Sequence, residues 1–274
     1  MSAGCDLAWT TVAPQWDRLR EHVEAMKADL TPLLLDALAI GPGNRVLELG
    51  GGTGELAARL AAAVAPGGSL VASDLAPGMV TLLEDRVGRL PGVEVAQLDA
   101  TDIGLASEQF DAVAFRMGLM LIPEPDPALR EMLRVLRPGG RLAVAVWGAP
   151  QDNPWMTCVG MAAMMHGLVS GGPPVGPGGP FSLADPDELE KLVRGAGYSE
   201  VSVRVVDSVV HFPDVETHAA VVGALAPPLA AAFAAAPDDT RAAVRRTLGE
   251  LTSQYAGPDG IRLPVRAVMC SAQR

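Results

Sequence analysis

Apolar residues follow two alternating patterns along positions 41–150. Short apolar runs that end at turn residues, the first at 45–49, are typical of strands buried in a parallel sheet. Longer stretches with helical spacing follow them, the first an alanine- and leucine-rich segment at 56–64. This alternation predicts an α/β domain with a mainly parallel sheet. Further strands are expected at 69–73, 93–97, 110–115 and 141–147, and further helices at about 76–89 and 128–136.

The N-terminal region precedes this alternation and shows helical spacing instead. One helix is expected at about 17–26 and a second at about 30–39. Two of the four tryptophans of the chain, Trp9 and Trp16, lie in this region. They either pin a loose helix to the domain or belong to a lid over a ligand pocket, and both roles are compatible.

The C-terminal half has a different composition. A methionine-rich helix is expected at about 156–169, and it leads into a glycine- and proline-rich loop at 170–180. The last two strands are expected at 201–210 and 263–270, so about fifty mainly helical residues are inserted between them. Such an insertion predicts a substructure built onto one end of the sheet.

The glycine-rich stretch Glu48–Glu55 lies where the first strand turns into the first helix. Glycines at such a turn let a ligand approach the main chain and the N–H groups at the helix N-terminus. The dinucleotide fingerprint needs glycine at the sixth position counted from Gly50, where this chain has Glu55. Two acidic side chains disfavour a pyrophosphate here and favour a ligand that carries an ammonium group. The alternative is a glycine-rich turn that binds no ligand.

Composition and charge narrow the functional classes. The 274 residues carry 21 basic and 32 acidic side chains, a formal charge of −11, and no basic run, so nucleic acid is not an expected partner. Cys5, Cys158 and Cys270 are far apart without metal-ligand spacing, so we expect no metal site and a reduced, cytoplasmic setting. No signal peptide is expected. Residues 219–236 lack charge, but a Pro-Pro pair interrupts them, so no membrane span is expected.

Several motifs together point to a family. The sequence Glu-Leu-Gly-Gly-Gly-Thr-Gly at 48–54 resembles motif I of the class I S-adenosylmethionine (SAM) methyltransferases. The sequence Leu-Arg-Pro-Gly-Gly at 136–140 is similar to the motif that precedes their fifth strand. Acidic residues follow the second and third strands in the family's order, at Asp74 and Asp99. The resemblance covers about residues 40–150 and points to the small-molecule branch around the ubiquinone/menaquinone-type methyltransferases.

The resemblance implies an overall organisation. We expect an α/β fold with a Rossmann-like, doubly wound sheet of seven strands, mostly parallel with an antiparallel last strand, plus helical cap elements. Residues 1–40 are then an N-terminal helical lid, and 41–150 are the SAM-binding core. Residues 151–274 complete the sheet and carry helical substrate-cap insertions at about 151–182 and 211–260.

The resemblance also implies which residues hold the cofactor, SAM. Asp74 would accept the ribose hydroxyls, Asp99 the adenine amino group, and Ala100 would supply a backbone N–H, while Met79 would lie against the adenine face. The alternatives are a helix N-cap for Asp74, core packing for Met79, and Asp102 as a rival of Asp99. The full set of expected cofactor-binding residues is Glu48, Gly50, Gly51, Gly52, Gly54, Asp74, Leu75, Met79, Asp99, Ala100 and Arg116.

Methyl transfer from SAM requires little bond-making chemistry of the protein, since the methyl carbon is already activated, and positioning is the main task. A general base is needed only where the acceptor must lose a proton. His166, in the methionine-rich helix, is the first catalytic candidate, with a structural role as its alternative, and His211 is the second. His22 and His218 are expected to be solvated. Arg116 is expected to bind the SAM carboxylate or an acidic group of the substrate.

The expected acceptor pocket is hydrophobic and lined by Trp16, Met120, Trp155 and Met165, although such side chains also fill ordinary cores. We predict a SAM-dependent methyltransferase, monomeric or homodimeric, acting on a small, largely apolar acceptor such as a secondary metabolite, quinone or phenol. O-methylation is placed ahead of C- and N-methylation. Three alternatives remain: a SAM-binding enzyme with a non-methylating reaction such as cyclisation, a nicotinamide-dependent oxidoreductase, and a non-catalytic partner subunit.

Overall fold

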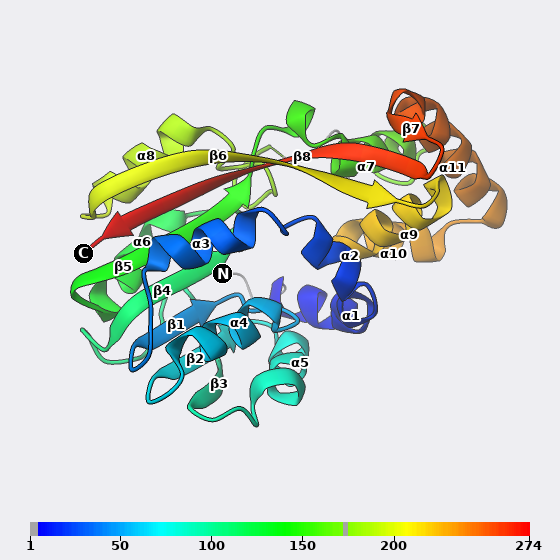
Figure 1. Cartoon of the computed structure of the whole chain (residues 1–274). Coiled ribbons are helices and arrows are strands. Elements are labelled where there is room, and N and C mark those ends of the chain that lie inside the picture. The colour runs from blue at the N-terminus through cyan, green and yellow to red at the C-terminus, as the bar shows by residue number, and fades with distance from the viewer. Residues whose placement is uncertain (1–4, 172–174) are drawn as a thin grey trace.

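The computed structural model describes residues 5–171 and 175–274 and contains one mixed sheet flanked by helices (Figure 1). The strands lie in the order β3-β2-β1-β4-β5-β8-β6, and a short strand β7 pairs with β8 at one end. β8 runs antiparallel to its neighbours, and the other pairs are parallel. The strands are β1 (Arg45–Leu49), β2 (Ser69–Asp74), β3 (Val93–Gln97), β4 (Phe110–Arg116), β5 (Leu136–Trp147), β6 (Ser199–Phe212), β7 (Ala256–Gly257) and β8 (Gly260–Gln273).

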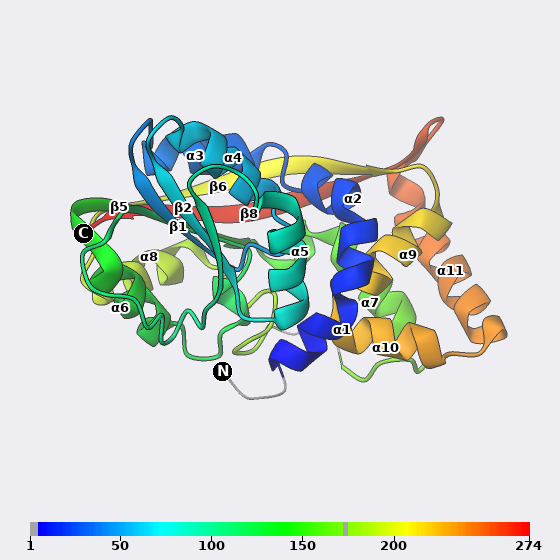
Figure 2. The ribbon, with the colours of Figure 1, turned by 90° about the horizontal axis from the view of Figure 1, so that it is seen from below.

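Helices cover both faces of the sheet. In Figure 2, α3 and α4 lie on one face, and α6 and α8 lie on the other. Leu47 and Leu49 are therefore both buried, as are Val46 and Glu48, which explains why β1 is apolar without alternation. The helices are α1 (Cys5–Arg18), α2 (Arg20–Ala25), α3 (Leu30–Leu38), α4 (Glu55–Val64), α5 (Pro77–Val87), α6 (Pro125–Val135), α7 (Pro154–Met165), α8 (Pro186–Gly195), α9 (Val215–Leu225), α10 (Pro227–Ala235) and α11 (Asp238–Thr252).

The expected Rossmann-like arrangement is confirmed, with two differences in the strands. β5 begins at Leu136 rather than at Arg141, because Leu136 pairs with Phe110 before the register shifts and regular pairing resumes. The last two strands are longer than expected, and β6 and β8 stay paired from Ser199 out to Phe212. This long antiparallel ribbon extends beyond the core and carries the inserted helices at its far end (Figure 1).

The inserted helices α9, α10 and α11 gather with α7 at that end of the β6–β8 ribbon, in both views (Figures 1 and 2). Pro227 begins α10 after the break at Ala226, so residues 219–236 form parts of two helices, as expected. Within the described ranges, no helix is both long and apolar enough to cross a membrane. Of the loop 170–180, residues 172–174 lie outside the described part of the chain, as do residues 1–4 of the predicted lid.

The first expected helix, at about 17–26, is present as α2, but the helix α1 that precedes it was not expected. A helix was expected from Asp17, after Pro14, but α1 runs from Cys5 to Arg18 with Pro14 inside it. Proline removes one helical hydrogen bond, which argued for a break. Tertiary packing outweighs this cost, since Ala13 and Trp16, on either side of the proline, pack with Met79 and its neighbours. The second expected helix is confirmed as α3.

Candidate functional site

The glycine turn lies at the carboxyl end of β1, between the strand and α4. Gly50, Gly52 and Gly54 have φ angles of 60°, 57° and 87°, the left-handed region that favours glycine. A Cβ added to Gly50 would lie 2.8 Å from Cε2 of Phe115 on β4, whereas one on Gly52 would meet no atom within 4 Å. The turn is therefore closed towards the sheet and open above Gly52, where main chain is available to a ligand.

Asp74 ends β2 and is tied directly to the glycine turn. Its Oδ2 accepts a hydrogen bond from Gly52 N at 3.0 Å, and its Oδ1 accepts one from Ala76 N at 3.0 Å. Burial raises the pKa of Asp74, and these backbone N–H groups partly oppose the shift. Each carboxylate oxygen has a second lone pair, so the side chain can still accept from two ribose hydroxyls.

Asp99 lies just beyond the end of β3, the strand that pairs with β2. Since Asp74 pairs with Gln97 in the β2–β3 register, the two acidic residues lie at the same edge of the sheet. Oδ1 of Asp99 accepts from Thr101 N at 2.8 Å and from Thr101 Oγ1 at 2.7 Å. Burial raises the pKa of Asp99, but these bonds outweigh it and lower the pKa overall. The structure thus brings the expected ribose and adenine acids together, and their roles stay predictions.

A buried group of charges lies beneath and beside the glycine turn. Arg116, the last residue of β4, donates to both carboxylate oxygens of Glu24 at 2.8 and 2.9 Å and to Thr31 Oγ1 at 2.7 Å. Nζ of Lys27 lies 2.6 Å from Oε1 of Glu24. Burial raises the pKa of Glu24, but Lys27 and Arg116 outweigh it and hold the pKa at about 2. Glu24 is therefore an anion that two cations share.

Glu48 differs from Glu24 because it lacks a matched cation. Its side chain is only 2% exposed, and no hydrogen bond from the described residues reaches Oε2. Burial raises its pKa to about 8, although Arg116 and Lys27 act in the opposite direction. A Cβ on Gly51 would lie 3.1 Å from this oxygen, so the carboxyl group faces the turn. An orphaned buried acid beside an open glycine turn fits a ligand with an ammonium group, as SAM has.

The N-terminal segment predicted to be a lid packs on α5, next to the turn, through α1. Trp16 of α1 packs with Met79 of α5, so two residues predicted for acceptor and cofactor lie in one cluster. Nε1 of Trp16 donates to Leu225 O of α9 at 3.0 Å, which joins the lid to the inserted helices. Both views place α1 between α5 and the helices α9 and α10 (Figures 1 and 2). An ion pair of 3.1 Å between Arg86 and Asp17 also holds the lid on α5.

The other expected acceptor residues lie in different surroundings. Met120 and Trp155 are 2% and 1% exposed, and Nε1 of Trp155 donates to Asn153 Oδ1 at 2.9 Å. Met165 is 61% exposed at the end of α7. Next to it, Nε2 of His166 lies 2.8 Å from Thr247 Oγ1 of α11, a contact between two cap helices. The catalytic role of His166 and the acceptor roles of these residues stay predictions, and the structure shows core packing for Met120 and Trp155.

The expectation that His218 is solvated was wrong. Its side chain is fully buried, stacks on Phe212 at 4.5 Å between ring centroids, and holds Nε2 2.6 Å from Trp155 O. Since a carbonyl oxygen only accepts, Nε2 carries the proton. Burial lowers the pKa of His218 to about 4. The helical spacing of His218 with Val221, Val222 and Leu225 would have placed it on the buried face of α9.

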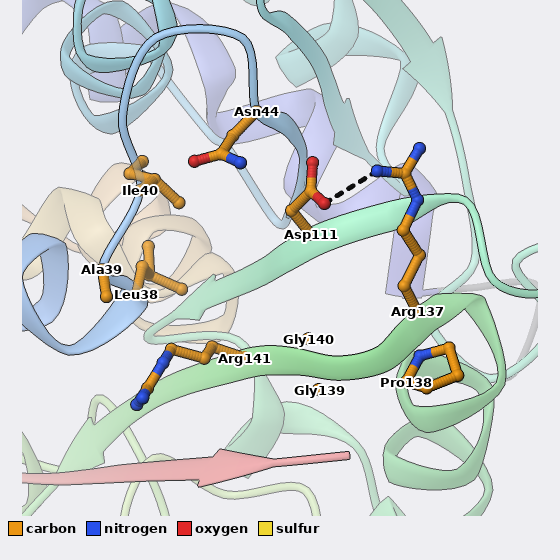
Figure 3. A pocket seen from close by; sticks show the side chains of 10 residues that line it. All are labelled: Leu38, Ala39, Ile40, Asn44, Asp111, Arg137, Pro138, Gly139, Gly140 and Arg141. Carbon is orange, nitrogen blue, oxygen red and sulfur yellow. Dashed lines mark hydrogen bonds and ion pairs between the residues drawn. The ribbon is translucent and has the colours of Figure 1, made fainter.

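A surface cavity of about 240 Å³ lies at the opposite end of the sheet, and the Leu-Arg-Pro-Gly-Gly sequence forms part of its lining (Figure 3). Arg137, from the Leu-Arg-Pro-Gly-Gly sequence, forms an ion pair of 2.7 Å with Asp111. The side chains of Arg137 and Arg141 point apart in Figure 3. Ligands of parallel α/β sheets bind beyond the carboxyl ends of the strands, and this cavity lies at the amino ends. The motif here shapes the turn from α6 into β5.

The strand order, the antiparallel β8, the open glycine turn and the acids after β2 and β3 are the arrangement expected for a class I SAM-dependent methyltransferase domain. The comparison with protein families agrees, because residues 47–144 match the family model described as a methyltransferase domain. Residues 47–144 therefore match this class of domain, and the residues of the turn fit its cofactor, SAM.

Individual relatives give the same assignment. The chain is 38% identical over 128 residues to a "Ubiquinone/menaquinone biosynthesis C-methyltransferase UbiE" from Ectopseudomonas mendocina, which covers 46% of this chain and 50% of the relative. The chain thus spans about half the length of the curated relatives that it matches. Among solved structures, the YcgJ protein from Bacillus subtilis has a TM-score of 0.61 at 16% identity, covering 89% of this chain and 97% of the other. The [4+2]-cyclase SpnF has a TM-score of 0.54 at 21% identity, covering 96% and 95%. These two likenesses concern the fold.

Proposed function

We propose that this protein is a SAM-dependent methyltransferase that acts on a small, largely apolar acceptor. The observation that carries the proposal is the set of groups around one turn: main chain open at Gly52, Asp74 bonded to it, and the orphaned acid Glu48 behind it. A polar adenosine and an ammonium-bearing amino acid tail match these groups. The methyltransferase domain over residues 47–144 supports the same function.

When bound, SAM supplies an activated methyl carbon, to which an acceptor atom forms its bond while the bond to sulfur breaks. The protein contributes position and a dry site, and orientation of this kind lowers barriers by up to about 7–11 kcal/mol. Asp74 and the glycine turn fix the adenosine end, and the lid, held by Trp16 and Arg86, covers it. Water exclusion is thus the task of α1 together with α9 and α10.

The atom that accepts the methyl group is part of the proposal. The curated relatives are named as C-methyltransferases of quinone biosynthesis, and this favours carbon, contrary to the order expected from the sequence. We propose a phenol or quinol ring as the acceptor, because such rings offer both carbon and oxygen nucleophiles and suit an apolar pocket. His166 is retained as the proposed base for a step that needs proton removal.

The deciding experiment combines a titration with a product analysis. Calorimetry with S-adenosylhomocysteine and, separately, NADH should give micromolar binding of the first and none of the second. Incubation with SAM and a panel of phenols, quinols and amines should then yield a product heavier by one methyl group, and NMR of the product distinguishes carbon from oxygen.

Each alternative has its own outcome. NADH binding without S-adenosylhomocysteine binding would replace the proposal by an oxidoreductase. A rearranged product of unchanged mass would indicate a cyclase that uses the same fold. If His166→Ala kept the full kcat across the pH range with an active acceptor, the base would have to be sought elsewhere.

A further inference from the structure

The lid contributes charges to the floor of the cofactor site, which its position in the sequence does not suggest. Glu24 lies in α2, and Lys27 follows it in the turn before α3. Glu24 pairs with both Lys27 and Arg116, the last residue of β4, and the charges of all three act on Glu48 at the end of β1. Lys27 is only 8% exposed. A lysine is seldom buried to this extent unless its charge is paired, and the partner of Lys27 is Glu24.

The acids of this group are paired unequally. Arg116 and Lys27 are two cations, and both pair with the single carboxylate of Glu24. The second carboxyl, Glu48, receives no hydrogen bond at Oε2 from the described residues and holds its proton to about pH 8. Lys27 and Arg116 thus share one carboxylate, while Glu55 and Asp74, whose charges also act on this group, are bonded to Arg86 and to the glycine turn. A zwitterion with one ammonium and one carboxylate complements Glu48 and the two cations at once.

We propose that Lys27 of the lid binds the carboxylate of the amino acid tail of the cofactor, while Glu48 binds the ammonium group of the same tail. This inference rests on the proposed function and names a specificity-determining residue for it. Glu24 is the positioning residue that holds Lys27 in place.

Lys27 suits this role better than Arg116 does. Nη1 and Nη2 of Arg116 already donate to Glu24 and Thr31, in a fixed planar geometry. The ammonium of Lys27 has three donors on a flexible stem and is bonded to one oxygen of Glu24. Burial, and after it the charge of Arg116, lowers the pKa of Lys27 to about 8. Glu24 therefore does not fully offset the cost of burying this ammonium group, and an added carboxylate would stabilise it.

The test uses three adenosine ligands with different tails. S-adenosylhomocysteine has an ammonium and a carboxylate, decarboxylated SAM has an ammonium and a sulfonium but no carboxylate, and 5′-methylthioadenosine has neither ammonium nor carboxylate. Calorimetry should show that Lys27→Met weakens S-adenosylhomocysteine about tenfold or more, as expected for a charged hydrogen bond. The same variant should leave the other two ligands within about twofold. Glu48→Gln should weaken S-adenosylhomocysteine and decarboxylated SAM, and leave 5′-methylthioadenosine unchanged.

Matched controls separate this role from folding. Lys191, the second of the two lysines in the chain, is exposed on α8, and Lys191→Met should change none of the three affinities. Lys27→Arg should retain most of the preference for S-adenosylhomocysteine over decarboxylated SAM. Unchanged S-adenosylhomocysteine affinity in Lys27→Met, or an equal loss for all three ligands, would overturn the inference. Failure of the wild-type protein to bind S-adenosylhomocysteine would instead overturn the proposed function.

Discussion

Arg116 at the end of β4 and Glu24 in the lid form a two-pronged ion pair, with N–O distances of 2.8 and 2.9 Å. Ninety-two residues separate them in the sequence, and the pair joins the last residue of a central strand to the N-terminal region. Both side chains are largely withdrawn from solvent, at 6% and 18% exposure. The pair therefore anchors the lid over the sheet edge where the cofactor is expected.

Replacing Glu24 by glutamine should strongly destabilise the protein. The change leaves Arg116 and Lys27 as buried cations without an anion, a loss that typically costs about 3–5 kcal/mol. Urea unfolding at pH 7 measures this decrease in the free energy of unfolding. The matched control is Glu190→Gln, which breaks an exposed pair with Arg194 and should cost under about 0.5 kcal/mol. Similar values for the two variants would contradict a buried anchor.

Cofactor binding should release a proton from Glu48. The pKa of this acid is raised to about 8 in the free protein, so at pH 7 it is mainly protonated. An ammonium group beside it favours the carboxylate and lowers the pKa, so binding expels the proton and affinity rises with pH up to about 8. Lys27, with a pKa of about 8, is already mainly charged at pH 7, so it takes up little further proton when the ligand binds.

Calorimetry in buffers of different ionisation enthalpy measures this release. Binding of S-adenosylhomocysteine at pH 7 should release a large fraction of one proton from the protein. The substitution Glu48→Gln should abolish most of this release. Equal proton release in the two proteins would exclude Glu48 as the source.

Asp74→Asn should weaken every adenosine-containing ligand. The carboxylate is expected to accept from the ribose, and an amide that replaces it loses about one charged hydrogen bond, or roughly tenfold or more in affinity. Because Asp74 also accepts from Gly52 N and Ala76 N, the glycine turn should loosen as well. Calorimetry should show similar losses for S-adenosylhomocysteine and 5′-methylthioadenosine, unlike Lys27→Met.

The control for Asp74 is an exposed acid of the same kind. Asp126→Asn on α6, which breaks an exposed pair with Arg130, should leave both affinities unchanged. Unchanged binding by Asp74→Asn would remove this residue from the cofactor site.

The inserted helices should lose stability in mild acid through His218. Its pKa is about 4 in the folded protein, where burial disfavours the charge, against 6.5 when exposed. The unfolded chain therefore binds a proton first, and stability falls as pH decreases from 6.5 to about 4, by about 3 kcal/mol in total. Unfolding in urea at several pH values should show this slope, and His218→Asn should lack it. A slope that is the same in both proteins would assign the acid sensitivity to other groups.

Much of the core could be predicted from the sequence because its signals are local. Neighbouring residues specify both the strand β1 and the turn that follows it. Gly50 and Gly54 of this turn have the positive φ angles that glycine alone adopts at low cost. Asp74 and Asp99 follow their strands directly, so the parallel sheet necessarily brings them to one edge. The long α1 helix through Pro14 was missed, since its stability comes from contacts with α5.

The sequence by itself determined the class of the domain, the strand order that follows from it, and the edge of the sheet where the cofactor is expected, because turn chemistry and strand ends depend on neighbouring residues. Only the tertiary structure decided which distant charges meet there. Glu24 and Lys27 are near neighbours in the sequence, but nothing there joins them to Arg116, and His218 is buried by packing against Phe212 and Trp155. Burial and ion pairing arise between elements far apart in the chain, so their effects on pKa and on binding appear only once the chain is folded.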